Sequence, residues 1–234
     1  MSDNPGGALA KRPLQFMWIV DCSGSMQGKK MATLNLAIKE TIQPMRDVAK
    51  GNPNADVLVR VVKFSDGAQW HISKPTPIEE FKWTDLEADG VTDLGKALTL
   101  AAEALKTENM PPRGLPPVLV LISDGQPTDD FAGGLKALMD QPWGMKAVRI
   151  GVAIGEDADL DVMQKFIANS EVKPLVSTNV QDLVNKIKWA STVPLKQASN
   201  PASRTPGKND NGGANIAIPA PPPNQPPIAP GDVF

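Results

Sequence analysis

Few residues in this sequence can bind zinc or form a disulfide. The chain has one cysteine, Cys22, and one histidine, His71. A single cysteine cannot form an intrachain disulfide, which agrees with a reducing compartment. These two residues are also too few for a zinc site, which takes about three or four nitrogen and sulfur ligands. Any metal bound by this chain must therefore be held by oxygen atoms.

The sequence also lacks a block of positive charge and a long apolar run. Its net charge is −2, so it has no basic surface of the kind that offsets phosphate charge in nucleic-acid binders. Residues 14–20 form the longest apolar run near the N-terminus. That run is much shorter than the roughly 20 residues of a membrane helix. We therefore expect a soluble, cytoplasmic protein that binds neither nucleic acid nor membranes.

The composition predicts one folded domain with appendages. Hydrophobic residues make up 41% and charged residues 21% of the 234 residues, close to the averages of globular proteins. Residues 201–234 hold nine prolines and no aromatic residue except Phe234, so they bury too little apolar surface to offset chain entropy. We expect a flexible N-terminus at 1–13, a domain at 14–192 and a Pro-rich disordered tail at 193–234, which serves as a spacer or a docking peptide.

Short apolar segments alternate with longer amphipathic ones along the domain, which is typical of βαβ units. Expected strands are residues 14–20, 57–64, 118–122 and 148–154, with a short edge strand at 83–86. Expected helices are residues 31–48, 94–105, 131–139, 160–168 and 180–190, the fourth with Asp159 as its N-cap. The pattern predicts a doubly wound α/β fold, with a mostly parallel sheet and helices on both faces.

Small oxygen-bearing side chains follow the first expected strand. Asp21, Ser23 and Ser25 come directly after it, and the carboxyl ends of parallel strands line the crevice where α/β proteins bind ligands. Thr92 precedes a helix and Asp124 follows the strand at 118–122, so both are expected at loops over the same edge. Carboxylate and hydroxyl oxygens suit a hard cation such as Mg²⁺.

This order of residues resembles the metal-ion-dependent adhesion site of the von Willebrand factor A family, an Asp-x-Ser-x-Ser followed by a lone Thr and a later Asp. The resemblance covers about residues 14–192. It implies that Ser23, Ser25 and Thr92 are direct metal ligands and that Asp21 and Asp124 reach the metal through water. It also implies a remaining metal position filled by an acidic residue of a partner protein. We expect Mg²⁺, with Mn²⁺ and Ca²⁺ as alternatives.

Three segments are similar to bacterial tellurium-resistance proteins of the TerY type, namely residues 20–26, 90–98 and 121–129. That closer resemblance implies a signalling or stress-response adaptor. It also implies a Ser/Thr protein kinase and a PP2C-type phosphatase as partners.

Enzyme functions fit the sequence less well, and we expect no catalytic residues. A P-loop needs four residues between its glycines and a Ser or Thr after its Lys, whereas three residues separate Gly24 from Gly28, and Lys30 follows Lys29. A magnesium-dependent phosphatase of the haloacid-dehalogenase type resembles Asp-x-Asp-x-Thr at this point, with the second Asp as acid/base. Ser23 stands there instead, and a hydroxyl is a poor general acid. A structural domain with a vestigial site is the third alternative.

Several polar residues near the expected site are predicted to be structural. Asp93 is expected to orient the loop that carries Thr92, and the Asp129-Asp130 pair to mark a helix start. Cys22 is expected to be buried, and His71 to lie at an edge or on the surface.

Overall fold

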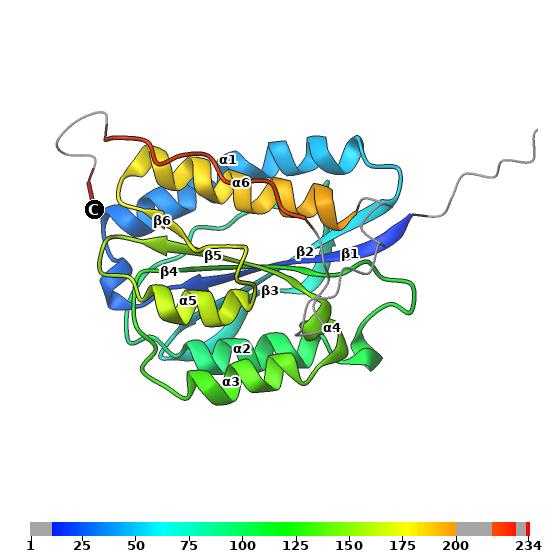
Figure 1. Cartoon of the computed structure of the whole chain (residues 1–234), viewed down its shortest axis with the longest axis horizontal. Coiled ribbons are helices and arrows are strands. Elements are labelled where there is room, and N and C mark those ends of the chain that lie inside the picture. Colours follow the sequence, from blue (N-terminus) through cyan, green and yellow to red (C-terminus); the bar gives the residue numbers. More distant parts are fainter. Residues whose placement is uncertain (1–10, 200–216, 228–232) are drawn as a thin grey trace, which may run out of the picture.

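The computed structural model describes residues 11–199, 217–227 and 233–234. A six-stranded sheet of order β3-β2-β1-β4-β5-β6 lies between two layers of helices (Figure 1). The strands are β1 (Arg12–Asp21), β2 (Ala55–Ser65), β3 (Gly67–Pro77), β4 (Val118–Ser123), β5 (Val148–Ile154) and β6 (Leu175–Ser177). Neighbouring strands are parallel, except that β3 is antiparallel to β2.

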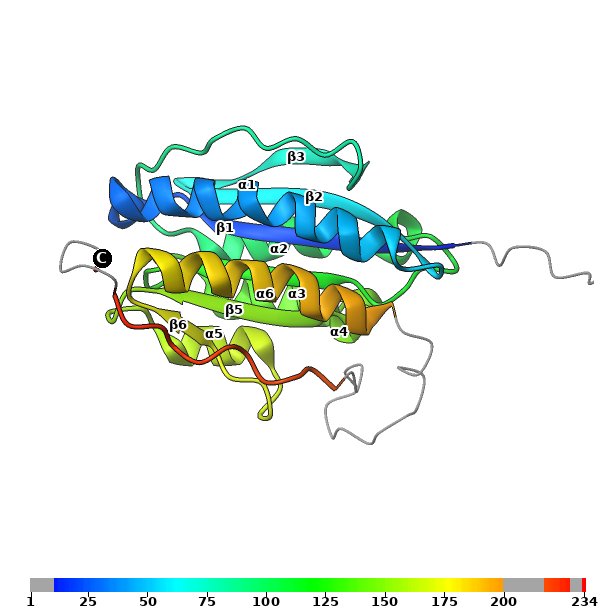
Figure 2. The same ribbon diagram turned by 90° about the horizontal axis from the view of Figure 1, so that it is seen from above.

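The helices divide between the two faces of the sheet. They are α1 (Lys29–Lys50), α2 (Leu94–Ala104), α3 (Phe131–Met139), α4 (Pro142–Lys146), α5 (Leu160–Ile167) and α6 (Val180–Ala198). Helices α1 and α6 lie side by side on one face, and α2, α3 and α5 cover the other (Figures 1 and 2). The predicted doubly wound fold is confirmed, as is the Asp159 N-cap, whose side chain accepts from two backbone N–H groups of α5.

Strand β1 shows why the central strands read as continuous apolar runs. Successive side chains of a strand point to opposite faces, so Phe16 and Trp18 pack under α1 and α6 while Met17 and Ile19 pack against α2. All four are at most 1% exposed. Because helices cover both faces of the sheet, residues 16–20 are all apolar and do not alternate with polar residues.

The expected edge strand at residues 83–86 is wrong. The antiparallel edge strand is β3, which follows β2 through a tight turn where Gly67 has φ 90°. Edge strands tolerate proline and polar residues, so β3, with Pro75 and Pro77, lacks a clear strand pattern. Residues 83–86 instead form a loop held by α1, because Asn35 Oδ1 accepts from Trp83 Nε1 at 3.0 Å and from Leu86 N at 2.9 Å.

The C-terminal region also differs from expectation. Helix α6 continues to Ala198, past the boundary expected at Thr192, and Leu195 and Ala198 are at most 1% exposed. The described tail residues run as an extended chain alongside α6 (Figure 2) rather than apart from the domain. The other tail residues and residues 1–10 lie outside the described part of the chain. None of the described helices is both long and apolar enough to span a membrane.

Candidate metal site

The sheet topology brings two acidic loops together. Strands β1 and β4 are parallel neighbours with Val20 in register with Ile122, so Asp21 ends one strand beside Ser123 at the end of the other. After β1 the chain crosses to β2 on one side, and it later returns to β4 on the opposite side. The crevice at such a reversal of strand order is where ligands bind in open α/β sheets.

Asp21 is fully buried at the floor of this crevice. One carboxylate oxygen accepts from Ser23 N at 2.8 Å and the other from the Ser123 hydroxyl at 2.5 Å. Burial raises the pKa of Asp21, an effect opposed by these hydrogen bonds and reinforced by the nearby Asp124 charge. Burial also raises the pKa of the Cys22 thiol, to about 12. Cys22 is 3% exposed, which confirms its predicted burial.

A chain of polar contacts runs from the first loop to Asp124. The hydroxyl oxygens of Ser23 and Ser25 are 3.0 Å apart, and the Ser25 hydroxyl donates to Asp124 Oδ1 at 2.7 Å. Because that hydroxyl has only one hydrogen, Ser23 must donate to Ser25. The other Asp124 oxygen accepts a short hydrogen bond from the ammonium group of Lys30, in the first turn of α1. Together with the hydrogen bond from Ser23 N to Asp21, these contacts directly join four of the five predicted residues.

Thr92 faces the same small space without a hydrogen bond joining its hydroxyl to the chain just described. A methyl group placed on Gly125 would lie 3.5 Å from Thr92 Oγ1 and 3.8 Å from Ser25 Oγ. The absence of a side chain at Gly125 therefore keeps open a space bordered by both hydroxyls. Thr92 is 6% exposed, and the Thr92 and Thr128 backbone segments are joined by Thr128 N donating to Thr92 O at 2.9 Å.

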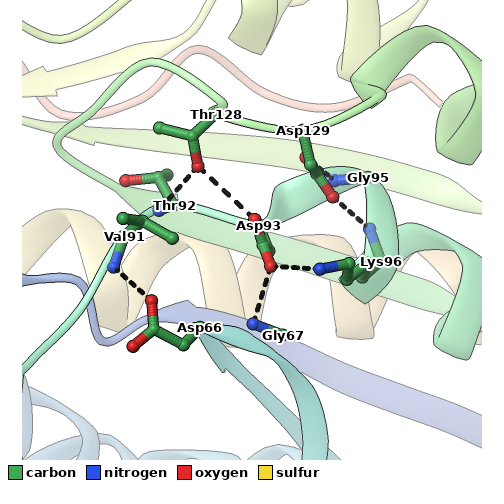
Figure 3. A network of polar contacts seen from close by, with 9 residues as sticks. All are labelled: Asp66, Gly67, Val91, Thr92, Asp93, Gly95, Lys96, Thr128 and Asp129. Atoms are coloured by element: carbon green, nitrogen blue, oxygen red, sulfur yellow. Dashed lines mark hydrogen bonds and ion pairs between the residues drawn. The ribbon is translucent and has the colours of Figure 1, made fainter.

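Asp93 fixes the loop that carries Thr92 (Figure 3). Its Oδ2 accepts from Gly67 N at 2.7 Å and from Lys96 Nζ at 2.6 Å. Its Oδ1 accepts from the Thr128 hydroxyl at 3.4 Å, and that hydroxyl in turn accepts from Thr92 N at 3.1 Å. The hydrogen bond from Lys96 lowers the pKa of the Asp93 carboxyl below its usual value. The predicted role of Asp93 in orienting this loop is confirmed.

Two further carboxylates close the network from either side. Asp129 accepts from Gly95 N and Lys96 N, both at 2.8 Å, and so caps the start of α2 from the loop after β4. Asp66 Oδ1 accepts from Val91 N at 3.1 Å. Asp130 caps α3 by accepting from Gly133 N, as expected for a helix start. Hydrogen bonds therefore tie the loop that carries Thr92 to the loop that carries Asp124.

The donor set fits a hard cation rather than a soft one. Within the described residues, no group of three or more His, Cys, Asp or Glu side chains is placed to hold a metal ion. Two carboxylates and three hydroxyls meet here instead, and the open space at Gly125 borders two of the hydroxyls. Oxygen ligands of this kind suit Mg²⁺, Mn²⁺ or Ca²⁺.

Comparison with known proteins identifies the fold. The family model of the von Willebrand factor type A domain matches residues 17–188. The chain belongs to the von Willebrand factor type A family. Domains of this family are in general protein-interaction or adhesion modules.

Relatives of this von Willebrand factor type A domain come from diverse proteins. The chain is 25% identical over 166 residues to human inter-alpha-trypsin inhibitor heavy chain H6, covering 64% of this chain and 12% of that protein. Among solved structures, von Willebrand factor type A from Catenulispora acidiphila is 18% identical with a TM-score of 0.59, covering 79% of this chain and 43% of that one. The PilB minor pilin from Streptococcus sanguinis is 15% identical with a TM-score of 0.61, covering 87% and 65%. This chain thus spans a small part of the human relative, and the likenesses to solved structures show the fold.

Two residues at this von Willebrand factor type A site were missed as site residues by sequence reasoning. Lys30 lies in a segment that does not match a P-loop, and its ammonium group contacts Asp124. Ser123 immediately precedes Asp124, and its hydroxyl donates to the Asp21 carboxylate. The signal for Ser123 was its place at the end of a strand adjacent to β1. No sequence signal ties Lys30 to a residue as distant as Asp124.

Proposed function

We propose that this domain binds a partner protein through a divalent cation held at the carboxyl edge of the sheet. The observation that carries the proposal is the connected set of oxygens from Ser23 through Ser25 to Asp124, with Thr92 bordering the same space at Gly125. In this proposal Ser23, Ser25 and Thr92 are the direct ligands. Asp21 and Asp124 act through water, and Mg²⁺ is the preferred ion, with Mn²⁺ and Ca²⁺ as alternatives.

The charges of the side chains at this edge favour binding of an anionic group once a cation is present. Asp21 is committed to Ser23 N and Ser123, so it holds the loop in shape and contributes negative charge from beneath. The hydroxyl ligands carry no charge. A bound divalent cation would therefore keep much of its positive charge and attract a carboxylate of the partner. An acidic residue at the centre of the partner's binding surface is the expected counterpart.

The finer assignment rests on the three motif segments similar to TerY-type proteins. It places the domain in a bacterial cytoplasm as an adaptor between a Ser/Thr protein kinase and a PP2C-type phosphatase. We propose this setting for a signalling or stress-response system related to tellurium resistance. Catalysis is not part of the proposal, because Ser23 stands where a haloacid-dehalogenase phosphatase needs its acid/base.

One observation favours a second candidate, a scaffold domain with a vestigial site. The Lys30 ammonium group already supplies a positive charge to Asp124, so the edge can be stable without a metal. The two candidates differ in whether a divalent cation binds and whether that binding changes a protein interaction.

Isothermal titration of Mg²⁺, Mn²⁺ and Ca²⁺ separates them. Asp124→Asn and Asp21→Ala should each abolish binding while circular dichroism shows a folded domain. Asp89→Asn is the matched control, since Asp89 is an exposed carboxylate on the neighbouring loop whose contact is with the adjacent Gly90 N. Absence of binding in the unmodified protein would support the scaffold candidate.

Partner capture then tests the second half of the proposal. Immobilised wild-type domain should retain a partner from a bacterial lysate with Mg²⁺ and release it with a chelator, and Asp124→Asn should retain none. Substituting the partner's acidic residues by amides should identify one whose loss equals the effect of the chelator. Retention that is indifferent to both chelator and Asp124→Asn would overturn the metal-bridge proposal.

A further inference from the structure

A buried polar cluster that includes none of the predicted metal ligands lies between the carboxyl end of β6 and the first two turns of α6. Asn179, Asp182 and Lys186 are each 2% exposed, although residues of these types are seldom so deeply buried. Asp182 and Lys186 form an ion pair at 2.5 Å, one turn apart on α6. A buried charge pair is stable only if its remaining donors and acceptors are also satisfied.

The folded domain satisfies only part of this cluster. Asn179 Oδ1 caps α6 by accepting from Asp182 N at 3.0 Å. Lys186 donates to Asp182 and, through a short hydrogen bond, to the backbone oxygen of Val176. These contacts leave three groups for another ligand: the third Lys186 donor, Asp182 Oδ1 and the Asn179 amide nitrogen.

Two adjacent residues of the tail meet all three groups. Asn224 Oδ1 accepts from Lys186 Nζ at 2.8 Å. Gln225 N donates to Asp182 Oδ1 at 3.2 Å, and Gln225 O accepts from Asn179 Nδ2 at 2.8 Å. Prolines flank this dipeptide on both sides. Because proline has no backbone N–H, the donor to Asp182 can come only from Asn224 or Gln225 within this stretch.

Apolar and backbone contacts also hold the tail before and after this Asn-Gln dipeptide. Ile218 and Phe234 are half-buried against the core cluster under α1 and α6. Phe234 N donates to Thr178 O at 3.1 Å, and Val233 forms an antiparallel bridge with Asn179. Figure 1 shows the chain following α6 from one end to the other, so the polar contacts lie between two apolar anchors.

We propose that Asn179, Asp182 and Lys186 form a peptide-binding site that selects an Asn followed by a residue other than proline, flanked by prolines, and that this site is filled in this protein by its own residues 217–227. The site reads an acceptor, a donor and a second acceptor in fixed order along the peptide. A peptide made only of proline lacks the backbone N–H that donates to Asp182. A proline-rich peptide without an Asn at position 224 lacks the side-chain oxygen that accepts from Lys186. The prolines restrict the free peptide and so lower the entropy lost on docking.

The test uses the full chain and a labelled peptide of residues 217–227. A full-length N224A/Q225P variant should release its tail, because it loses the acceptor for Lys186 and the donor to Asp182. Fluorescence anisotropy should then show the labelled wild-type peptide binding to this variant. Wild-type protein should bind the peptide at least about tenfold more weakly, because a tethered segment competes at roughly millimolar effective concentration.

Two controls make the result specific. Full-length Ala220→Ser, altered at an exposed tail position, should behave as wild type. A peptide carrying N224A/Q225P should bind the variant protein at least about tenfold more weakly than the wild-type peptide, since two hydrogen bonds to charged groups are lost. Equal binding of both peptides, or binding of neither, would overturn the proposal. The assay contains no divalent metal, so its outcome is independent of the proposed function.

Discussion

Replacing Lys30 by methionine should tighten divalent metal binding at the candidate site. The Lys30 ammonium group contacts Asp124, whose side chain is fully buried and also accepts from Ser25. A cation that enters beside these residues must either displace that ammonium group or bind against its charge. Methionine keeps most of the aliphatic stem of lysine and removes the charge, so the variant isolates this competition.

The expected size follows from the burial of the ion pair. A hydrogen bond to a charged group contributes about 1.5–3 kcal/mol when buried, whereas an exposed ion pair contributes about 0–1 kcal/mol. Asp124 is 0% exposed and Lys30 is 23% exposed at their side chains, which lies between these cases. A difference of about 1.5 kcal/mol corresponds to a dissociation constant for Mg²⁺ about tenfold lower in Lys30→Met.

Titration calorimetry of wild type, Lys30→Met and Lys29→Met measures this difference. Lys29→Met removes the same charge from the adjacent position, where the side chain contacts Val233 O at 3.4 Å, so it corrects for the general loss of positive charge. Mg²⁺ affinity in Lys30→Met that is equal to or weaker than in Lys29→Met would refute the reasoning. It would mean that displacing the Lys30 ammonium group from Asp124 costs no free energy, or that this group stabilises the loop that carries Asp124.

Three further outcomes concern stability. Asp93→Asn should lower the free energy of unfolding by about 1 kcal/mol at pH 7. Since the folded pKa of Asp93 is below its usual value, its contribution is complete above about pH 4 and is lost as the pH falls through the folded pKa. Gly134→Ala should cost about 1–3 kcal/mol, because the added carbon would lie 2.2 Å from Gly95 O where α3 crosses α2. Ending the chain after Thr192 should cost about 2–5 kcal/mol, because buried Leu195 is removed.

Urea denaturation followed by circular dichroism measures all three. For Asp93→Asn, a difference from wild type that persists unchanged at pH 3 would contradict the ionic origin. For Gly134→Ala, a gain in stability, as in an isolated helix, would contradict the close helix contact. For the truncation, a chain ended after Ser199 is the matched control: it also lacks the tail but retains the whole of α6, so it should be more stable than the chain ended after Thr192.

Local patterns were sufficient for the central strands and the long helices. Strands β1, β4 and β5 are buried on both faces, so every residue from Val148 to Ile154 is buried and the run is continuous. Strand β3 was missed because, as an edge strand, it needs no apolar face, and Pro75 interrupts its pattern. Residues 83–86 do not form the expected strand because Trp83 Nε1 and Leu86 N donate hydrogen bonds to Asn35 of α1 instead of pairing with a neighbouring strand.

The sequence by itself determined which residues stand at the carboxyl edge. Asp21, Ser23, Ser25, Thr92 and Asp124 each follow a strand or precede a helix, and the connectivity of a parallel sheet brings such positions to one edge. Only the tertiary structure decided that Lys30 contacts Asp124 and that the tail docks on α6. Both contacts join residues far apart in the sequence, through a few scattered groups that leave no periodic pattern in the chain.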